Sequence, residues 1–189
     1  MADASKPTAR SLSLDATAVL VLDDGTVIWG EGIGAAKSAT GEVCFNTSLT
    51  GYQEVMTDPS YAGQIVNFTF PHIGNVGTNT EDFEALKPAA RGLVVREPIT
   101  EPSNYRCDQN LGDWLTTQDL PGITGIDTRR LTRHIRKVGA PSGVLCHNPR
   151  GNFDFDALVT LAKGWPGLKG MDLAKEVTTK TNYDWTEGV

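Results

Sequence analysis

The sequence predicts an α/β fold in which layers of strands and helices share one core. Strand-like runs come first in the chain, whereas the clearer helical patterns appear only in the second half, mixed with further strands. This order is typical of a β/α layered domain and not of a regular βαβ winding. Hydrophobic residues make up 39% and charged residues 21% of the 189 residues, which is the balance of a globular domain.

The chain opens with a predicted β-hairpin. Residues 17–22 form a continuous apolar run that ends in Asp23-Asp24-Gly25, and a second strand-like run follows at 26–30. Two such runs joined by a tight turn that contains glycine are a strong hairpin signal.

Two more strands are predicted before residue 71. In residues 42–47 the polar and apolar positions alternate, which points Val43 and Phe45 to the same face. Residues 64–70 form the next strand, which Pro71 ends. We expect the segments that follow these strands, 48–61 and 72–79, to be loops, the first with one helical turn.

The second half alternates short strands with helices. Its best-defined helix begins after Asp127, a good N-cap residue, and ends at Gly139. Leu131, Ile135 and Val138 stand at i, i+4 and i+7 and would form its apolar stripe. The other elements predicted here are strands at 92–96, 122–125 and 143–147 and helices at 110–115 and 155–163.

The domain is expected to occupy residues 17–168. Residues 1–16 are polar, lack the apolar run of a signal peptide and are interpreted as a flexible tail. Proline and glycine are dense at 164–170, which predicts a boundary, and 169–189 would be a connector too short for a second core. No stretch approaches the roughly 20 apolar residues that span a bilayer. We therefore expect a cytoplasmic protein with no membrane partner.

Charge and cysteine content exclude several classes of protein. The net charge is −6, which argues against broad nucleic-acid binding because phosphate neutralisation needs a basic surface. Cys44, Cys107 and Cys146 are odd in number and contain no C-x-x-C pair, so they fit neither a disulfide framework nor a zinc site. We expect reduced thiols.

A glycine-rich segment at 30–35 nominally fits the G-x-G-x-x-A pattern of dinucleotide-binding folds. In those folds a long helix opens at the motif and its N-terminus holds the pyrophosphate. Here residues 36–41 lead directly into another strand instead. We interpret the segment as a turn at the end of a strand.

No catalytic motif emerges from the sequence. Cys146 and His147 are neighbours on a predicted strand, so their side chains point to opposite faces and cannot form a dyad. The spacing of His72, His134 and His147 gives no support to a metal site. A free-standing enzyme that uses His72 as acid–base would need a carboxylate such as Asp58 close in space.

Five cations gather on the predicted helix of this acidic chain, namely Arg129, Arg130, Arg133, Arg136 and Lys137. Such a run is usually a solvated helix face, and cations near a helix C-terminus are favoured by the helix dipole. The other interpretation is a docking surface for an acidic partner or an anion, including nucleic acid. The sequence leaves these alternatives open.

Several idiosyncratic blocks resemble one known family. They are residues 45–54, 57–61, 71–77, 126–129, 131–133, 166–168 and 170–177. In this order they resemble the signature blocks of the carbamoyl-phosphate synthase small chain, and they extend over nearly the whole chain beyond Leu20.

The resemblance implies a fold, an activity and partners. The fold would be the "swivelling" domain, with β/β/α layers, a mixed sheet and short helices. In the family this domain docks the large subunit, and the intact small subunit hydrolyses glutamine and passes ammonia to the large subunit. The large subunit, which holds ATP and Mg²⁺, makes carbamoyl phosphate for arginine and pyrimidine biosynthesis, while this domain binds no cofactor.

The family continues into a class I glutamine amidotransferase domain with a Cys-His-Glu triad. The sequence stops at Val189, and none of its residues maps onto that triad. We therefore expect this chain to dock its own glutaminase domain and the large subunit, and to be inactive alone. Arg129, Arg130 and Arg133 are the expected contacts with the large subunit.

Ser60 is the residue that we expect to touch the substrate. By resemblance, the serine of the Asp-Pro-Ser-Tyr block reaches the glutamine bound in the neighbouring domain. A turn made rigid by Asp58-Pro59 can present the next side chain, and a hydroxyl can donate to a carboxylate or accept from an ammonium group. The alternative is that Ser60 only hydrogen-bonds within its own turn.

Overall fold

The computed structural model describes residues 16–179, 181, 182 and 184. All but the last residue of the predicted tail, and seven positions of the predicted connector, therefore lie outside the described residues. Within the described part, no helix is both long and apolar enough to cross a bilayer.

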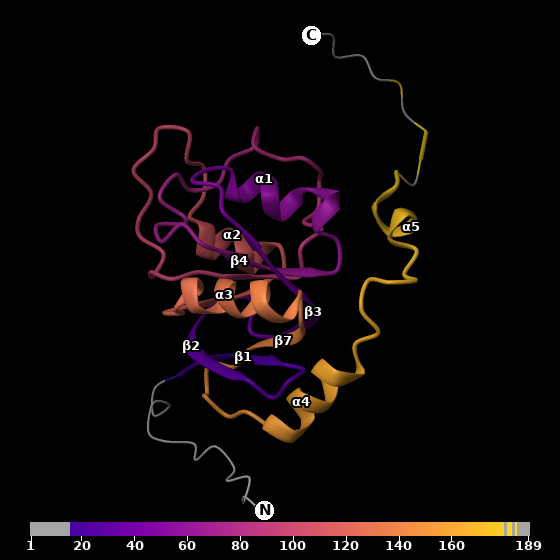
Figure 1. Cartoon of the computed structure of the whole chain (residues 1–189). Helices are drawn as coiled ribbons and strands as arrows, with labels where there is room; N and C mark the ends of the chain where they lie inside the picture. Colours follow the sequence, from indigo (N-terminus) through magenta and orange to yellow (C-terminus); the bar gives the residue numbers. More distant parts are fainter. Residues whose placement is uncertain (1–15, 180, 183, 185–189) are drawn as a thin grey trace, which may run out of the picture.

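The elements follow the predicted order (Figure 1). The strands are β1 (Ala18–Leu22), β2 (Val27–Gly34), β3 (Ser38–Asn46), β4 (Gln64–Phe68), β5 (Gly92–Val94), β6 (Pro121–Thr124) and β7 (Ser142–His147). The helices are α1 (Tyr52–Thr57), α2 (Leu111–Thr117), α3 (Thr128–Val138), α4 (Phe155–Gly164) and α5 (Leu173–Val177), with a 3₁₀ turn η1 (Pro59–Tyr61) after α1.

The seven strands close into a barrel in the order β1-β2-β6-β5-β4-β3-β7. Strands β3, β4, β5 and β6 pair in parallel, whereas β1 pairs antiparallel with both β2 and β7. Two antiparallel pairs, β2 with β6 and β3 with β7, join the halves. The predicted α/β class, mixed sheet and short helices are confirmed.

The barrel interior is apolar because alternate residues of the strands point inward. It holds Leu20 of β1, Ile65 of β4 and Leu145 of β7, all fully buried. Val43 and Phe45 belong to this same cluster, which confirms that they share a face. Leu131 and Ile135 of α3 also belong to it, so α3 packs on the barrel through these two side chains.

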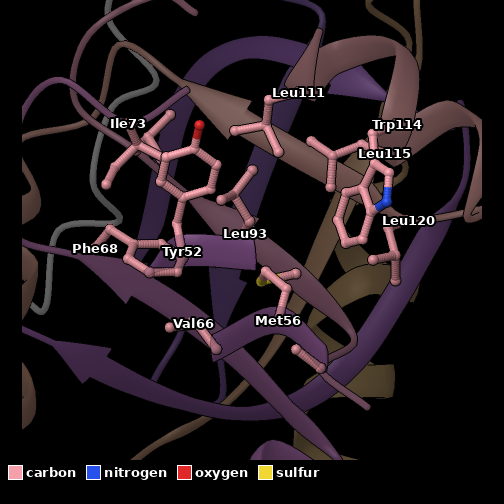
Figure 2. Close-up of a cluster of buried hydrophobic side chains, with 12 residues drawn as sticks. Tyr52, Met56, Val66, Phe68, Ile73, Leu93, Leu111, Trp114, Leu115 and Leu120 are labelled. Atoms are coloured by element: carbon pink, nitrogen blue, oxygen red, sulfur yellow. The ribbon is translucent and has the colours of Figure 1, made fainter. Parts of the chain in front are cut away.

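Helices cover the outer faces of the two halves. Tyr52 and Met56 of α1 and Trp114 of α2 pack with Phe68 and Leu93 against the parallel half (Figure 2). Helix α4 packs on the antiparallel half, at the opposite end of the view in Figure 1. Helix α5, which the sequence analysis did not predict, buries no residue and lies to one side of the barrel in Figure 1.

Helix α3 begins at the predicted position, but only two of the three residues of its apolar stripe are buried. Asp127 accepts a hydrogen bond from the backbone N–H of Arg130 at 2.9 Å, which confirms it as the N-cap. Leu131 and Ile135 are buried, whereas Val138, the third residue of the predicted apolar stripe, is 55% exposed. Val138 is the last residue of the helix, where the chain turns away from the barrel through Gly139.

Replacing Asp127 with alanine is expected to lower the free energy of unfolding by about 1 kcal/mol, because the N–H of Arg130 loses its acceptor. Urea denaturation measures this change. Asp127→Asn retains an acceptor and should be nearly neutral. Equal losses in both variants would contradict a capping role.

The interpretation of residues 30–35 as a turn was wrong, because β2 continues through Gly34. The glycines there serve close packing. A Cβ atom on Gly32 would lie only 2.0 Å from Cδ2 of His147 on β7, so a larger residue at that position would have to displace the His147 ring. As expected, the next element is strand β3 and no helix opens at the motif, so the dinucleotide-binding pattern lacks its structural context.

Candidate functional site

The turn that carries Ser60 is held by its own backbone and by one carboxylate. Asp58 follows α1, and its Oδ1 accepts a hydrogen bond from the N–H of Ser60 at 2.8 Å. Pro59 occupies the first position of η1, and the N–H of Tyr61 donates to the carbonyl of Asp58. The hydroxyl of Tyr61 in turn accepts from Nδ2 of Asn46 on β3 at 2.9 Å. The predicted rigid turn is therefore present and is tied to the barrel.

Ser60 itself is exposed. Its hydroxyl makes no hydrogen bond with any residue that the structure describes, since the contact with Asp58 uses the backbone N–H. The side chain is thus presented to solvent on a fixed turn. The one hydrogen bond of Ser60 among the described residues is this backbone contact within its own turn, so the substrate role of the hydroxyl stays a prediction.

The chain that leaves α4 returns to this turn and forms what we call the C-terminal clasp (Gly63, Arg91, Trp165 and Leu168). Gly63 adopts φ +77°, and a Cβ atom there would lie 2.8 Å from Cδ2 of Leu168. The guanidinium of Arg91 lies over the Trp165 ring, 5.2 Å from its centroid. The clasp thus brings residues 165–168 against Gly63, which is three residues beyond Ser60 in the sequence.

A basic groove of about 660 Å³ lies between α3 and the ends of three parallel strands. Thr47, Thr69 and Arg96 follow β3, β4 and β5, and their side of the groove faces Arg129 and Arg133 of α3, with Arg136 on the same helix. Ligands of parallel sheets commonly bind at the carboxyl ends of strands. Four arginines and no carboxylate line this groove.

The three arginines that the sequence predicted as a partner interface line two different hollows. Arg129 and Arg133 line the basic groove, but Arg130 lines a separate hollow of about 990 Å³ beside β2. At 3.6 residues per turn, Arg130 and Lys137 lie about a quarter turn away from the groove side of the helix. All of these cations are exposed.

A contact between a histidine and a carboxylate, which is an ion pair when the imidazole is protonated, lies at the hollow that contains Arg130. Nε2 of His134 is 3.2 Å from Oδ2 of Asp24, the turn residue between β1 and β2. Burial alone would raise the pKa of Asp24, but hydrogen bonds from Thr26 and the charge of His134 lower it overall. This carboxylate is therefore stabilised in its ionised form, as an internal pairing between α3 and the hairpin.

None of the cysteines is placed as a nucleophile. Burial, followed by the charge of Glu42, raises the pKa of the Cys44 thiol to about 12, so it stays protonated at neutral pH. Cys146 packs in the apolar cluster under α4, whereas His147 binds the carbonyl of Ala35 through Nδ1. Within the described residues, no hydrogen bond joins a cysteine to a histidine.

The rival catalytic arrangement gains no support. His72 is exposed, and its ring meets that of Phe70 edge-on at 6.1 Å. In the described part of the chain, neither a hydrogen bond nor an ion pair joins His72 to Asp58. Over the same residues, no group of three or more His, Cys, Asp or Glu side chains could hold a metal ion.

Arg96 is the residue of the basic groove that the sequence analysis missed. It follows β5, 33 positions before Arg129, and its Nε lies 3.3 Å from Oε1 of Glu97. No local pattern links Arg96 to the arginines of α3. Only the closure of the barrel places them in one groove.

Comparison with known proteins identifies relatives over most of the chain. The sequence model of the carbamoyl-phosphate synthase small chain, CPSase domain, matches residues 20–145. Carbamoyl phosphate synthase small chains of Mesorhizobium japonicum and Rhizobium meliloti are 58% and 57% identical to this chain over 175 residues. That of Zymomonas mobilis is 54% identical over 170 residues.

Each of these matches covers 90% of this chain but only 44–46% of the relative, so the chain spans less than half of their length. Among solved structures, a subtilisin-like protease from Pseudoalteromonas sp. AS-11 covers 77% of this chain with a TM-score of 0.38 and 15% identity, a likeness too low to carry an argument. Since the family's sequence model matches well over half of the residues, this chain belongs to the carbamoyl-phosphate synthase small chain family.

Proposed function

We propose that this chain is the N-terminal part of the small subunit of a glutamine-dependent carbamoyl-phosphate synthase. It docks the larger synthetase subunit and frames one side of the glutamine site. The assembled enzyme makes carbamoyl phosphate from glutamine, bicarbonate and ATP for arginine and pyrimidine biosynthesis. Small chains that are 54–58% identical over 90% of this chain support the assignment. In this proposal ATP and Mg²⁺ bind to the larger subunit, and this domain binds no cofactor.

The barrel would correspond to the "swivelling" domain of the family. A parallel half, an antiparallel half and covering helices supply the components of a β/β/α arrangement.

The observation that carries the glutamine-site role is the C-terminal clasp. It brings residues 165–168 against Gly63, three residues beyond Ser60, and the relatives extend well beyond the part that this chain matches. The connector that follows residue 168 therefore starts near an exposed serine whose hydroxyl has no partner among the described residues. Ser60 is proposed to contact the glutamine bound in a domain beyond that connector.

Competition with a complete small chain tests the docking role. This chain, added in excess, should displace the complete small chain from the larger subunit and lower glutamine-dependent synthesis of carbamoyl phosphate. Synthesis from ammonia should be unchanged, because that reaction does not need glutamine hydrolysis. By itself the chain should release no ammonia from glutamine, since no described cysteine is paired with a histidine.

Analytical ultracentrifugation of the chain mixed with the larger subunit provides the direct measure of binding. If the chain neither sediments with the larger subunit nor lowers glutamine-dependent synthesis at any excess, the docking role is wrong.

A further inference from the structure

We propose that the basic groove between α3 and the ends of β3, β4 and β5 binds an acidic segment of the larger subunit. This inference rests on the proposed function, which it deepens by naming the surface and the chemistry of its partner. It also replaces the expected contact set of Arg129, Arg130 and Arg133, because the structure separates Arg130 from the other two.

The first argument is the absence of internal ion pairs for the three groove cations on α3; the fourth groove cation, Arg96, pairs with Glu97 at 3.3 Å. Arg106, which lies outside the groove, pairs with Asp82 at 2.6 Å and with Glu81 at 3.2 Å. Among the described residues, neither Arg129 nor Arg133 forms an ion pair, and the same holds for Arg136. In a chain of net charge −6, these side chains concentrate positive charge in one place.

The shape of the groove favours an extended ligand. Arg129, Arg133 and Arg136 stand at i, i+4 and i+7, so they follow one side of the helix over roughly 10 Å. Arg96 contributes from the strand ends, together with the hydroxyl side chains of Thr47 and Thr69. One small anion could meet only part of this row, whereas a peptide segment with several carboxylates could meet all of it.

Arginine chemistry points to carboxylates in particular. The planar guanidinium group binds a carboxylate through two parallel N–H···O hydrogen bonds, and it is more weakly hydrated than an ammonium group. A groove with four arginines and no lysine suits protein carboxylates held at an interface. Nucleic acid is disfavoured, because a phosphate backbone needs a longer basic track than one helix on an acidic chain supplies.

The groove is also preorganised. Nδ2 of Asn67, a fully buried residue of β4, donates to the carbonyl of Thr128 at 3.1 Å and to Oγ1 of Thr132 at 2.9 Å. Both threonines line the groove, so its floor is fixed to the barrel before any ligand arrives. Fixed donors lower the ordering cost of binding.

Two double variants distinguish an effect of the groove itself from an effect of the chain's net charge. Arg129→Glu/Arg133→Glu reverses two groove cations, whereas Arg130→Glu/Lys137→Glu makes the same change in net charge outside it. All four side chains are exposed, so both variants should fold, and circular dichroism checks this. The association rate with the larger subunit at low salt should fall about tenfold or more for the groove variant and only two- to threefold for the control. The groove variant should also lose most of the salt dependence of association.

Equal rates for the two double variants would overturn the inference while leaving docking itself intact. A labelled oligoglutamate peptide provides a second measurement that does not need the larger subunit. It should bind the unmodified chain and the Arg130/Lys137 variant at low salt, but not the groove variant. If the peptide does not distinguish the two variants, or if an oligodeoxythymidylate of equal charge binds the groove as tightly, an acidic protein segment is not its ligand. If the peptide result is as expected but the chain does not associate with the larger subunit, the proposed function fails and the partner assignment fails with it.

Discussion

In a complete small chain that carries this domain, replacing Ser60 with alanine should raise the KM for glutamine about tenfold or more, while kcat changes little. A hydrogen bond to a charged group contributes ~1.5–3 kcal/mol, and this one would be lost. The contact would be made to the non-reacting end of the substrate, so it would stabilise the ground state and the transition state equally. Steady-state synthesis of carbamoyl phosphate, with glutamine varied, measures the effect.

The chain offers a matched control in Ser48. It too is an exposed serine whose N–H donates to the side chain of the residue two positions earlier, Asn46 Oδ1 at 2.8 Å. Ser48→Ala should leave the KM for glutamine unchanged, and ammonia-dependent synthesis should be normal in both variants. If Ser60→Ala stays within twofold of the wild-type KM, roughly 0.4 kcal/mol, the substrate role of Ser60 is wrong.

The largest expected effect on stability comes from Leu115→Ala, which should lower the free energy of unfolding by about 2–5 kcal/mol. Leu115 is fully buried in α2, in the cluster that covers the parallel half of the barrel (Figure 2). Alanine is the better helix former, so the loss reports packing alone. A Cβ atom on Gly34 would lie 2.7 Å from Cβ of Leu115, which shows how closely α2 approaches β2.

Leu86→Ala makes the same chemical change at a side chain that is 95% exposed. Its effect should lie within about 0.5 kcal/mol of zero. Urea denaturation of both variants, with circular dichroism as the signal, gives the comparison. Similar losses at the two positions would mean that the cluster around α2 is not the tightly packed core described above.

The elements that the sequence predicted best were those specified by local chemistry. Alternation placed Val43 and Phe45 on one face, and Asp127 marked the start of α3, because side-chain direction and capping depend only on near neighbours. The interpretation of residues 30–34 as a turn was wrong because their glycines are required by close contacts with other strands, such as that of Gly32 with His147. Strand pairing across the chain cannot be read from such local patterns.

The candidate sites, like the helices and strands, could be predicted only where neighbouring residues in the sequence specify them. The sequence indicated the rigid turn around Ser60, since Asp58 and Pro59 specify it locally. It did not separate Arg130 from Arg129 and Arg133, although helical geometry alone requires that separation. Arg96 could not be predicted from the sequence as part of the basic groove, because only the pairing of β5 within the barrel places it there.

Closure of the barrel through β7 has a consequence for how the protein is made. Strand β7 pairs with both β1 and β3, so neither pairing can form until residues 142–147 have left the ribosome. Roughly 120 residues separate β1 from β7, which at about 5–20 residues per second is a delay of about 6–24 s. During that time the apolar strand β1 can pair along one edge only, with its hairpin partner β2, and its other edge stays open to unwanted pairing. The nascent chain therefore exposes an apolar strand edge until β7 has been synthesised.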